Sequence, residues 1–240
     1  MQSVIIIPAR LKSSRLSEKL LLPLDGKPII QWTYEACLNA READAVWIAV
    51  DDPKLLEVCQ QFTDRVRLTA VDHPSGTDRV AELAKTLEAD FVVNVQGDEP
   101  FIEAELIDAI FQTLRLDDAP MVSAMIANSD LDMMNRPETV KVVINQAHQA
   151  LYFSRALLPF SRDGQAAASY WQHIGIYGFR RQALLQFVDW PPSHLEQLEK
   201  LEQLRALENG LSIKMVIAET PAFGIDTPAD YEAAKSRLGL

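Results

Sequence analysis

The residues most suited to chemistry lie in a cationic segment near the N-terminus. An apolar run, 4–8, leads into residues 10–19, which we call the cationic segment. Residues 4–27 hold five cations and two acids in a protein of net charge -11: Arg10, Lys12, Arg15, Lys19 and Lys27 against Glu18 and Asp25. Arginine and lysine both bind phosphate oxygens. A buried strand that ends in such a segment predicts a polyphosphate site at the carboxyl edge of a sheet, although a solvated basic loop would show the same composition.

The chain has nine glycines, and they form neither of the common glycine-rich phosphate motifs, G-x-G-x-x-G or G-x-x-x-x-G-K-[ST]. This argues against a P-loop kinase and a dinucleotide dehydrogenase. Phosphates would therefore be bound mainly by side-chain cations and backbone N–H groups of the cationic segment.

Two separate acids are candidate metal ligands. Asp98 follows a predicted buried strand and Gly97, and a carboxylate at that position can hold Mg²⁺, although an acidic turn is also a common helix cap. Asp226 precedes Thr227 and Pro228, which suit the N-cap and first position of a helix, so capping does not explain Asp226. If the fold brings both acids together, they form a divalent-ion site.

Two further groups could contact a substrate. Small residues at 75–77, before Asp78 and Arg79, would let a flat ligand such as a base approach the backbone, or would form an ordinary loop and N-cap. His173 and Tyr177 lie two alternations apart on a predicted strand and so share a face. That pair could face a substrate, or His173 could be a semi-buried histidine with its hydrogen bonds satisfied.

The elements that must position these residues follow an alternating pattern in the first half of the chain. Apolar strands separated by helices indicate βαβ units on a mostly parallel sheet. The predicted strands are 3–8, 45–50, 66–69, 90–96 and 121–127. Predicted helices begin with Pro28 in the first turn, with Asp52 as N-cap before Pro53, and cover 77–88 and 103–115. We expect an α/β fold with a Rossmann-like sheet flanked by helices, as in nucleotidyltransferases.

From about residue 140 the pattern changes to strands without intervening helices, at 140–144, 150–153 and 174–179. Residues 140–190 thus predict an antiparallel β lobe over the site or a dimerisation region, and 161–170 a flexible loop. Ser193 and Glu196 form a capping box for a long helix through Leu207, ended by Asn209 and Gly210. A strand at 212–219 and a helix from Thr227 close a single domain, 1–240.

Composition limits the classes of partner. The 240 residues are 48% hydrophobic, enough for a substantial core. The acidic balance argues against nucleic acid and anionic membrane partners. There is neither an apolar run long enough to span a membrane nor a signal-peptide pattern, so we expect a cytoplasmic protein. Cys37 and Cys59 are predicted to be reduced core thiols.

Taken in order, these segments resemble the 3-deoxy-manno-octulosonate (Kdo) cytidylyltransferases, the CMP-Kdo synthetases of Gram-negative bacteria. The resemblance covers essentially the whole chain. It rests on ten motifs: Ile6–Arg10, Ser14-Arg15-Leu16 with Lys19, Gly26–Ile29, Ser75–Arg79, Asn94–Pro100, Val140–Val143, Ala150–Arg155, His173–Tyr177, Leu201–Arg205 and Asp226-Thr227-Pro228.

The resemblance implies a reaction in which CTP and an ulosonic acid, Kdo or 8-amino-Kdo, give a CMP-sugar and pyrophosphate with Mg²⁺. It assigns the triphosphate to Arg10, Arg15 and Lys19, and the metal to Asp98 and Asp226, with Asp98 also counted as catalytic. It assigns the nucleoside to Ala9, Ser75, Gly76 and Gln96, and the sugar to Arg155, His173, Tyr177, Glu202 and Gln203. It also implies a homodimer and a role in lipopolysaccharide biosynthesis.

One departure from the family pattern concerns the cationic segment. The family loop reads Arg-Leu-Pro-Gly-Lys-Pro-Leu, whereas this chain has Ser17 and Glu18 in place of Pro-Gly. We expect Glu18 to add an anion beside the triphosphate and to alter nucleotide affinity or sugar preference.

Three alternatives stay open at this point. A CMP-sialic acid type synthetase would release pyrophosphate with a different sugar. A nucleotide-binding paralogue would bind CTP without turnover, and a nucleotide-sugar glycosyltransferase would use a CMP-sugar without releasing pyrophosphate.

Overall fold

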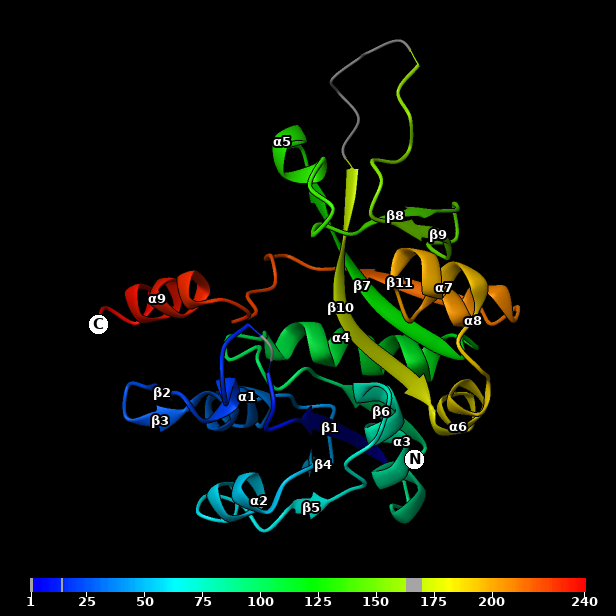
Figure 1. Ribbon diagram of the computed structural model, residues 1–240. Coiled ribbons are helices and arrows are strands. Elements are labelled where there is room, and N and C mark those ends of the chain that lie inside the picture. The colour runs from blue at the N-terminus through cyan, green and yellow to red at the C-terminus, as the bar shows by residue number, and fades with distance from the viewer. Residues whose placement is uncertain (1, 14, 163–169) are drawn as a thin grey trace. The chain divides into compact units, whose positions relative to one another are not determined.

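The computed structural model describes residues 2–13, 15–162 and 170–240. The chain divides into two compact units: unit 1, Met1–Phe111 with Ala222–Leu240, and unit 2, Gln112–Pro221. Figure 1 labels their helices and strands. A single domain over 1–240, with 140–190 as a lobe or dimerisation region, stays a prediction.

Unit 1 is built on a parallel sheet of four strands in the order β6-β1-β4-β5. These are β1 (Ser3–Ala9), β4 (Ala45–Val50), β5 (Val66–Leu68) and β6 (Phe91–Asn94). The flanking helices are α1 (Ile29–Cys37), α2 (Pro53–Cys59), α3 (Gly76–Thr86), α4 (Ala104–Leu116), which continues into unit 2, and α9 (Pro228–Arg237). A 3₁₀ turn, η1 (Lys19–Leu21), and a hairpin of β2 (Pro23–Leu24) and β3 (Lys27–Pro28) connect β1 to α1.

The central strand β1 explains where a ligand can bind in unit 1. All seven of its residues are buried, as expected for a parallel strand that is covered on both faces. The chain continues from β1 to β4 on one side and later adds β6 on the other side. The loops after β1 and β6 therefore diverge at the carboxyl edge of the sheet, which is the ligand crevice of such folds.

The helix starts follow the predicted capping residues. Asp52 caps α2 through a bond from Lys54 N at 2.8 Å, with Pro53 as the first helical residue. Thr227 and Asp230 form a capping box at α9. Pro28 differs from the prediction: its ψ of 149° is extended, so it precedes the helix, and α1 begins at Ile29.

Unit 2 contains the predicted β-rich region. Its sheet places β7 (Met121–Asn128) between the parallel strand β11 (Ile213–Ile217) and the antiparallel strand β10 (Tyr170–Arg180), which also pairs antiparallel with β8 (Lys141–Ile144); β8 in turn pairs with β9 (Ala150–Ser154). Helices α5 (Leu131–Met134), α6 (Arg181–Asp189), α7 (His194–Glu199) and α8 (Leu204–Glu208) complete the unit. The predicted fold class, a mostly parallel α/β sheet with an antiparallel addition, is confirmed.

The prediction of one long helix from Ser193 to Leu207 is wrong. The capping box at its start is present, but α7 ends after Glu199 and Lys200 adopts a left-handed conformation with φ 54°. Arg155 Nε donates to the Glu199 carbonyl at 2.7 Å, and Ser154 Oγ donates to the Glu199 carboxylate at 2.6 Å. These contacts from β9 interrupt the helix. Of the loop predicted at 161–170, residues 163–169 lie outside the described residues.

Candidate active site

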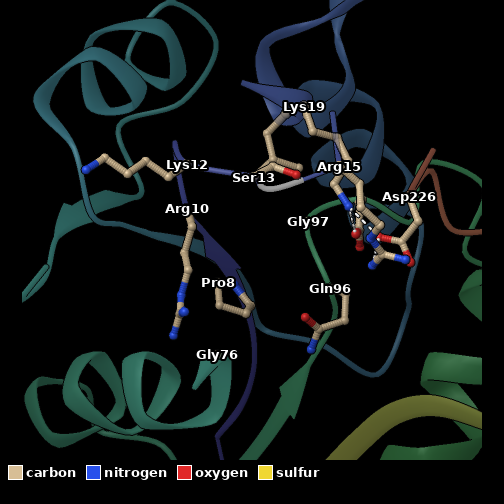
Figure 2. A pocket seen from close by; sticks show the side chains of 12 residues that line it. Pro8, Arg10, Lys12, Ser13, Arg15, Lys19, Gly76, Gln96, Gly97 and Asp226 are labelled. Atoms are coloured by element: carbon tan, nitrogen blue, oxygen red, sulfur yellow. Dashed lines mark hydrogen bonds and ion pairs between the residues drawn. The ribbon is translucent and has the colours of Figure 1, made fainter. Parts of the chain in front are cut away.

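Unit 1 has a cavity of about 350 Å³ at the carboxyl ends of β1 and β6 (Figure 2). The cationic segment supplies Arg10, Lys12, Ser13, Arg15 and Lys19 to its wall. The rest of the lining is Pro8, Leu20, Gly76, Gln96, Gly97, Asp98 and Asp226. The sequence prediction of an anion site at this edge thus corresponds to a real concavity.

Lys19 lies between the two predicted acids. Its Nζ donates to Asp226 Oδ1 at 2.9 Å and to Asp98 Oδ2, and Arg15 Nη2 lies 3.0 Å from the same Asp226 oxygen. Burial alone would lower the pKa of Lys19, but the charges and hydrogen bonds of Asp98 and Asp226 raise it. The ammonium is therefore a permanent cation at this site.

The two acids come from segments far apart in the chain. Ile225 N donates to the Asp98 carbonyl at 2.9 Å, which fixes the backbone before Asp226 against the loop after β6. The α9 cap then holds the next residues, because Asp230 accepts from Asp226 N at 3.1 Å and from Thr227 N at 2.8 Å. The structure thus brings Asp98 and Asp226 together, while metal binding by them stays a prediction.

A third acid lies beside this pair. Glu99 is buried, and burial together with the charges of Asp98 and Asp226 raises its pKa to about 8. It is therefore mainly protonated at neutral pH and adds little charge. The sequence indicates Glu99 as an acid but does not indicate its burial.

Gly97 is needed for close packing under the cavity. A Cβ at this position would lie 3.1 Å from both the Pro8 carbonyl oxygen and Ile30 Cδ1. Sequence reasoning passed over Gly97, Pro8 and Ser13 as site residues. Only the position of Gly97 between a buried strand and Asp98 could have indicated its role.

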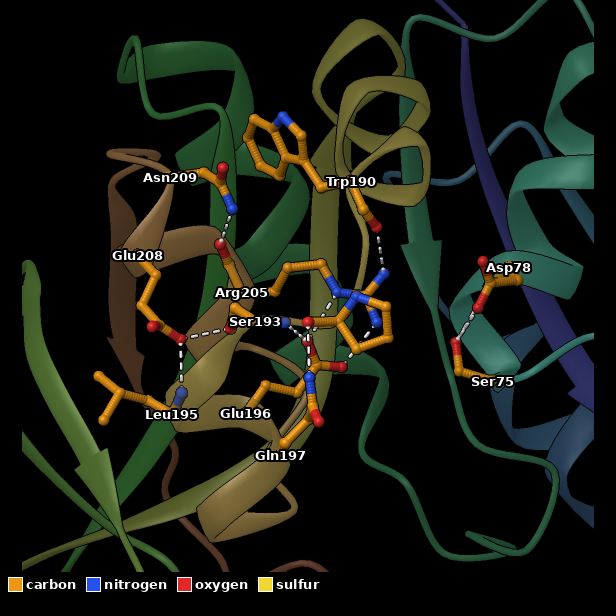
Figure 3. A network of polar contacts seen from close by, with 11 residues as sticks. Ser75, Asp78, Trp190, Ser193, Leu195, Glu196, Gln197, Arg205, Glu208 and Asn209 are labelled. Atoms are coloured by element: carbon orange, nitrogen blue, oxygen red, sulfur yellow. Dashed lines mark hydrogen bonds and ion pairs between the residues drawn. The ribbon is translucent and has the colours of Figure 1, made fainter.

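The remaining predicted nucleotide residues divide into two groups. Gly76 and Gln96 line the cavity, whereas Ala9 is buried in β1, and the hydroxyl of Ser75 caps α3 by accepting from Asp78 N at 3.2 Å (Figure 3). Arg10 lines the cavity and donates from Nη2 to the His73 carbonyl at 2.7 Å.

The unusual residue Glu18 turns away from these cations. Its carboxylate pairs with Lys54 Nζ at 2.6 Å, and it does not line the cavity formed by Arg10, Arg15 and Lys19. Its backbone has φ 49° and ψ 35°, the left-handed region that favours glycine. The backbone of Glu18 thus has a conformation that the glycine of the family pattern adopts without steric cost. The Glu18 carboxylate, which was expected beside the phosphates, instead pairs with Lys54 on α2.

In unit 2 three of the predicted sugar residues, His173, Tyr177 and Gln203, form a neutral cluster in which Tyr177 and Gln203 are buried and His173 is partly buried. The His173 ring lies 4.8 Å from that of Phe153 and 5.6 Å from that of Tyr177 between ring centroids. Tyr177 donates its hydroxyl to Gln203 Oε1 at 3.1 Å. Gln203 Nε2 is buried and has no hydrogen-bond partner in the described part of the chain. Burial lowers the pKa of His173 to about 3, so its imidazole is neutral.

An irregularity in β10 brings His173 and Tyr177 together. Opposite β7, the pairing shifts between Ile174 and Tyr177, so simple alternation does not hold there. Ser123 fills the shift: its Oγ lies 2.9 Å from His173 Nε2 and donates to the Ile176 carbonyl at 2.9 Å. The shared face was predicted, but the bulge and the role of Ser123 were not.

Arg155 has a different environment from the one expected of a ligand for a sugar carboxylate. Its guanidinium donates to three backbone carbonyls, those of Pro137, Glu199 and Lys200. These bonds join β9 to α7, which is a structural task. Glu202, immediately before Gln203, is partly exposed.

Arg205, two residues after Gln203, joins this segment to Glu196 and Trp190; Figure 3 shows these contacts. It donates from Nε and Nη2 to Glu196 at 2.8 and 2.6 Å, and from Nη1 to the Trp190 carbonyl at 3.2 Å. The guanidinium also lies 4.8 Å from the Phe187 ring centroid. The capping residue Glu196 thus has a second partner that sequence analysis missed.

Ligands for a metal ion are few. In the part of the chain that the structure describes, no group of three or more His, Cys, Asp or Glu side chains could hold a metal ion. A bound metal ion would need substrate oxygens besides Asp98 and Asp226. Across the same residues, no helix has the length and apolar character needed to cross a membrane.

Comparisons with known proteins agree with the motifs. The model of the cytidylyltransferase family matches residues 4–214. The 3-deoxy-manno-octulosonate cytidylyltransferase of Rhodopirellula baltica is 47% identical to this chain and 99% of each chain is covered. The Escherichia coli protein of the same name is 40% identical, with coverage of 99% of this chain and 96% of its own.

A solved structure is also closely similar. It is that of a CMP:2-keto-3-deoxy-manno-octonic acid synthetase complexed with CTP, at 40% identity and a TM-score of 0.95, with 100% of this chain and 99% of that chain covered. Full-length similarity at this level, together with the cavity at the sheet edge, shows that the chain belongs to the 3-deoxy-manno-octulosonate cytidylyltransferase family of nucleotidyltransferases.

Proposed function

We propose that this protein transfers CMP from CTP to Kdo and gives CMP-Kdo and pyrophosphate. The observation that carries the proposal is the cavity of unit 1, in which side chains of the cationic segment face two carboxylates. A triphosphate needs several cations, and its transfer reaction needs charge neutralisation at the α-phosphorus. The CTP complex of the similar synthetase supports the choice of nucleotide.

In this proposal Arg10, Arg15 and Lys19 hold the triphosphate. Gly76 and Gln96 contact the nucleoside from the cavity wall, with Ala9 and Ser75 supplying backbone groups beside it. The anomeric hydroxyl of the sugar attacks the α-phosphorus as the bond to the bridging oxygen breaks. Pyrophosphate leaves and the hydroxyl proton passes to solvent. Catalysis is then mainly positioning and charge neutralisation.

Asp98 and Asp226 suit a magnesium ion in this reaction. Their carboxylates reach one common atom, Lys19 Nζ, and two carboxylates plus substrate phosphates are a usual donor set for Mg²⁺. Bound Mg²⁺ would neutralise phosphate charge and make the attacking hydroxyl more acidic. Lys19 now donates to both acids, so it must release at least one of them when they hold a metal ion.

The cluster of unit 2 suits the sugar. Within residues 2–13, 15–162 and 170–240, Gln203 Nε2 is a buried donor without a partner, and Tyr177 and His173 lie beside it. Such a donor favours a ligand that supplies a hydroxyl or carboxylate oxygen. Glu202 and Arg155 belong to the same proposal through their neighbouring positions. The choice between Kdo and 8-amino-Kdo, the role in lipopolysaccharide synthesis, the cytoplasmic location and the homodimer are further parts of it.

The proposal is tested by measuring pyrophosphate release from CTP and Mg²⁺ with Kdo, 8-amino-Kdo or a sialic acid, with mass spectrometry of the product. We expect release with Kdo or its 8-amino analogue, and a product of CMP joined to that sugar. Release with sialic acid alone would contradict the sugar assignment. CTP binding without release in any reaction would instead identify a paralogue that lacks the activity.

A further inference from the structure

Arg79 on α3 is a buried cation to which the proposed reaction gives no task. Its side chain is fully buried and does not line the cavity. Nη1 donates to Thr69 Oγ1 and to the Ala70 carbonyl, the latter at 3.0 Å. Among the residues that the structure describes, neither Nε nor Nη2 has a hydrogen-bond partner. A buried guanidinium that is only partly satisfied is costly, so its position calls for an explanation.

One connection runs from Arg79 to the cationic segment through Asp51. Arg79 Nη2 lies 3.8 Å from Asp51 Oδ2 at the end of β4. The other oxygen of Asp51 accepts from Leu11 N at 2.9 Å. Asp51 is therefore held between the buried cation and the backbone of the residue that follows Arg10.

A second connection reaches Arg10 itself through the loop after β5. Arg79 holds that loop at Thr69 and Ala70. Glu82, on the same helix, accepts from Ala70 N at 3.0 Å and bonds the ring of His73. The carbonyl of His73 in turn accepts from Arg10 Nη2 at 2.7 Å. Both connections end within two consecutive residues of the cationic segment.

We propose that Arg79 is a positioning residue for the triphosphate site: through Asp51 and the loop at 69–73 it fixes Leu11 and Arg10 in the geometry that binds the nucleotide. The inference rests on the proposed function for the identity of the nucleotide. Arg79 acts through its neighbours and touches neither substrate. A lysine cannot replace it, because only the planar fork reaches Thr69, Ala70 and Asp51 from one side chain.

The test compares Arg79→Lys and Asp51→Asn with the wild type. The second variant keeps an oxygen for Leu11 N and removes the charge that faces Arg79. We expect Arg79→Lys to raise the Michaelis constant for CTP about tenfold and Asp51→Asn to raise it severalfold. The turnover at saturating CTP and the Michaelis constant for the sugar should change less than about twofold. Arg65→Lys, an exposed arginine of the same unit, is the matched control.

Calorimetric titration with CTP alone separates this proposal from the proposed function. A wild type that binds CTP but turns over no ulosonic acid contradicts the function, and weaker CTP binding by both variants still supports the role of Arg79. A lower melting temperature with wild-type CTP affinity would show a purely structural role and overturn the proposal. If Arg79→Lys does not fold, Asp51→Asn decides: wild-type CTP affinity in that variant also overturns it.

Discussion

The two candidate substrate regions differ in how they handle charge. The cavity of unit 1 is lined by charged side chains that are paired with one another and partly exposed, such as Arg15 and Asp226 at 62% and 47%. The cluster of unit 2 is mostly buried and neutral: His173 is uncharged, and Gln203 Nε2 has no hydrogen-bond partner among the residues that the structure describes. One region is suited to a polyanion with counterions, and the other to a ligand with many hydroxyl groups.

This contrast indicates how each region recognises its ligand. In unit 1 the cations are already bound to Asp98, Asp226 and backbone groups, so a triphosphate must exchange one set of ion pairs for another. Such an exchange gives only moderate affinity for the triphosphate, and that affinity depends strongly on the charges of the lining side chains. In unit 2 a ligand oxygen can supply the partner that the buried donor of Gln203 lacks among the described residues, which favours selectivity for ligands with correctly placed oxygens.

The largest expected effect tests the charge of unit 1. Asp98→Asn and Asp226→Asn each remove one carboxylate from the proposed metal pair, and the loss of several kcal/mol of charge stabilisation corresponds to about a hundredfold or more in turnover. Turnover at limiting Mg²⁺ and Mn²⁺ binding by paramagnetic resonance measure the change. Asp64→Asn is the control, because this exposed acid lies outside the cavity lining.

The two Asp variants also change the ion pairs of Lys19. Each Asp variant leaves Lys19 with one carboxylate in place of two, so the ammonium stays near the other acid. Near-native turnover and unchanged Mn²⁺ affinity in either variant would refute the two-carboxylate assignment. The contrast with unit 2 would then rest on the cations alone.

A smaller effect is expected from the donor in unit 2. Gln203→Glu keeps an oxygen acceptor for Tyr177 and replaces the unpartnered amide nitrogen with an oxygen. The loss of one buried hydrogen bond to the ligand costs about 1–3 kcal/mol, so the Michaelis constant for the sugar should rise about tenfold or more. The Michaelis constant for CTP should stay within about twofold. Steady-state kinetics with each substrate varied in turn measures both.

Tyr177→Phe should have a smaller effect than Gln203→Glu on the Michaelis constant for the sugar. It leaves the ring contacts with His173 and removes only the hydroxyl that orients Gln203. An increase in the sugar constant smaller than that of Gln203→Glu would support the orienting role. If a variant changes the Michaelis constants for CTP and for the sugar equally, the cluster affects the stability of the protein and not the recognition of the sugar.

Much of this contrast was predictable from the sequence, because it follows from local patterns. The continuous apolar run of β1 predicted a buried parallel strand. Asp52 and Thr227 predicted helix starts through side-chain caps. Each of these signals is contained in fewer than ten neighbouring residues.

The features that could not be predicted depend on partners far away in the chain. The helix is interrupted at Lys200, where Ser154 on β9 and Arg155, the residue after β9, bind Glu199. The Arg155 guanidinium is likewise bound to backbone carbonyls that lie 18 or more residues away in the chain. The neutral state of His173 follows from burial in the folded unit, and nothing in its neighbouring residues indicates it.

The pH dependence of the free energy of unfolding tests whether His173 in unit 2 is neutral. Burial lowers its pKa from 6.5 to about 3, so between these values the folded protein binds fewer protons than the unfolded chain. The free energy of unfolding contributed by this group therefore falls as the pH falls through that range. His173→Gln should make the loss of stability between pH 7 and pH 5 smaller, as measured by urea unfolding at both values. Parallel pH dependences in the two proteins would contradict a neutral buried His173.

The smallest effect concerns Glu18, the departure from the family pattern that the sequence predicts to lie beside the triphosphate. Glycine at this position relieves the cost, about 1–2 kcal/mol, of holding an L-residue in the left-handed conformation. It also adds backbone entropy to the unfolded chain and deletes an exposed ion pair with Lys54. These terms nearly cancel, so Glu18→Gly should raise the free energy of unfolding by only about 0.5 kcal/mol.

Because the Glu18 carboxylate is held at Lys54, the Michaelis constant for CTP should change less than about twofold in the same variant. Lys54→Ala provides the opposite perturbation, since it releases that carboxylate without changing the backbone. If Glu18→Gly improves the constant severalfold while Lys54→Ala worsens it, the carboxylate reaches the phosphates during binding. Glu18 would then act as an internal competitor for Arg15 and Lys19, and the ion-pair exchange inferred for unit 1 would include a third acid.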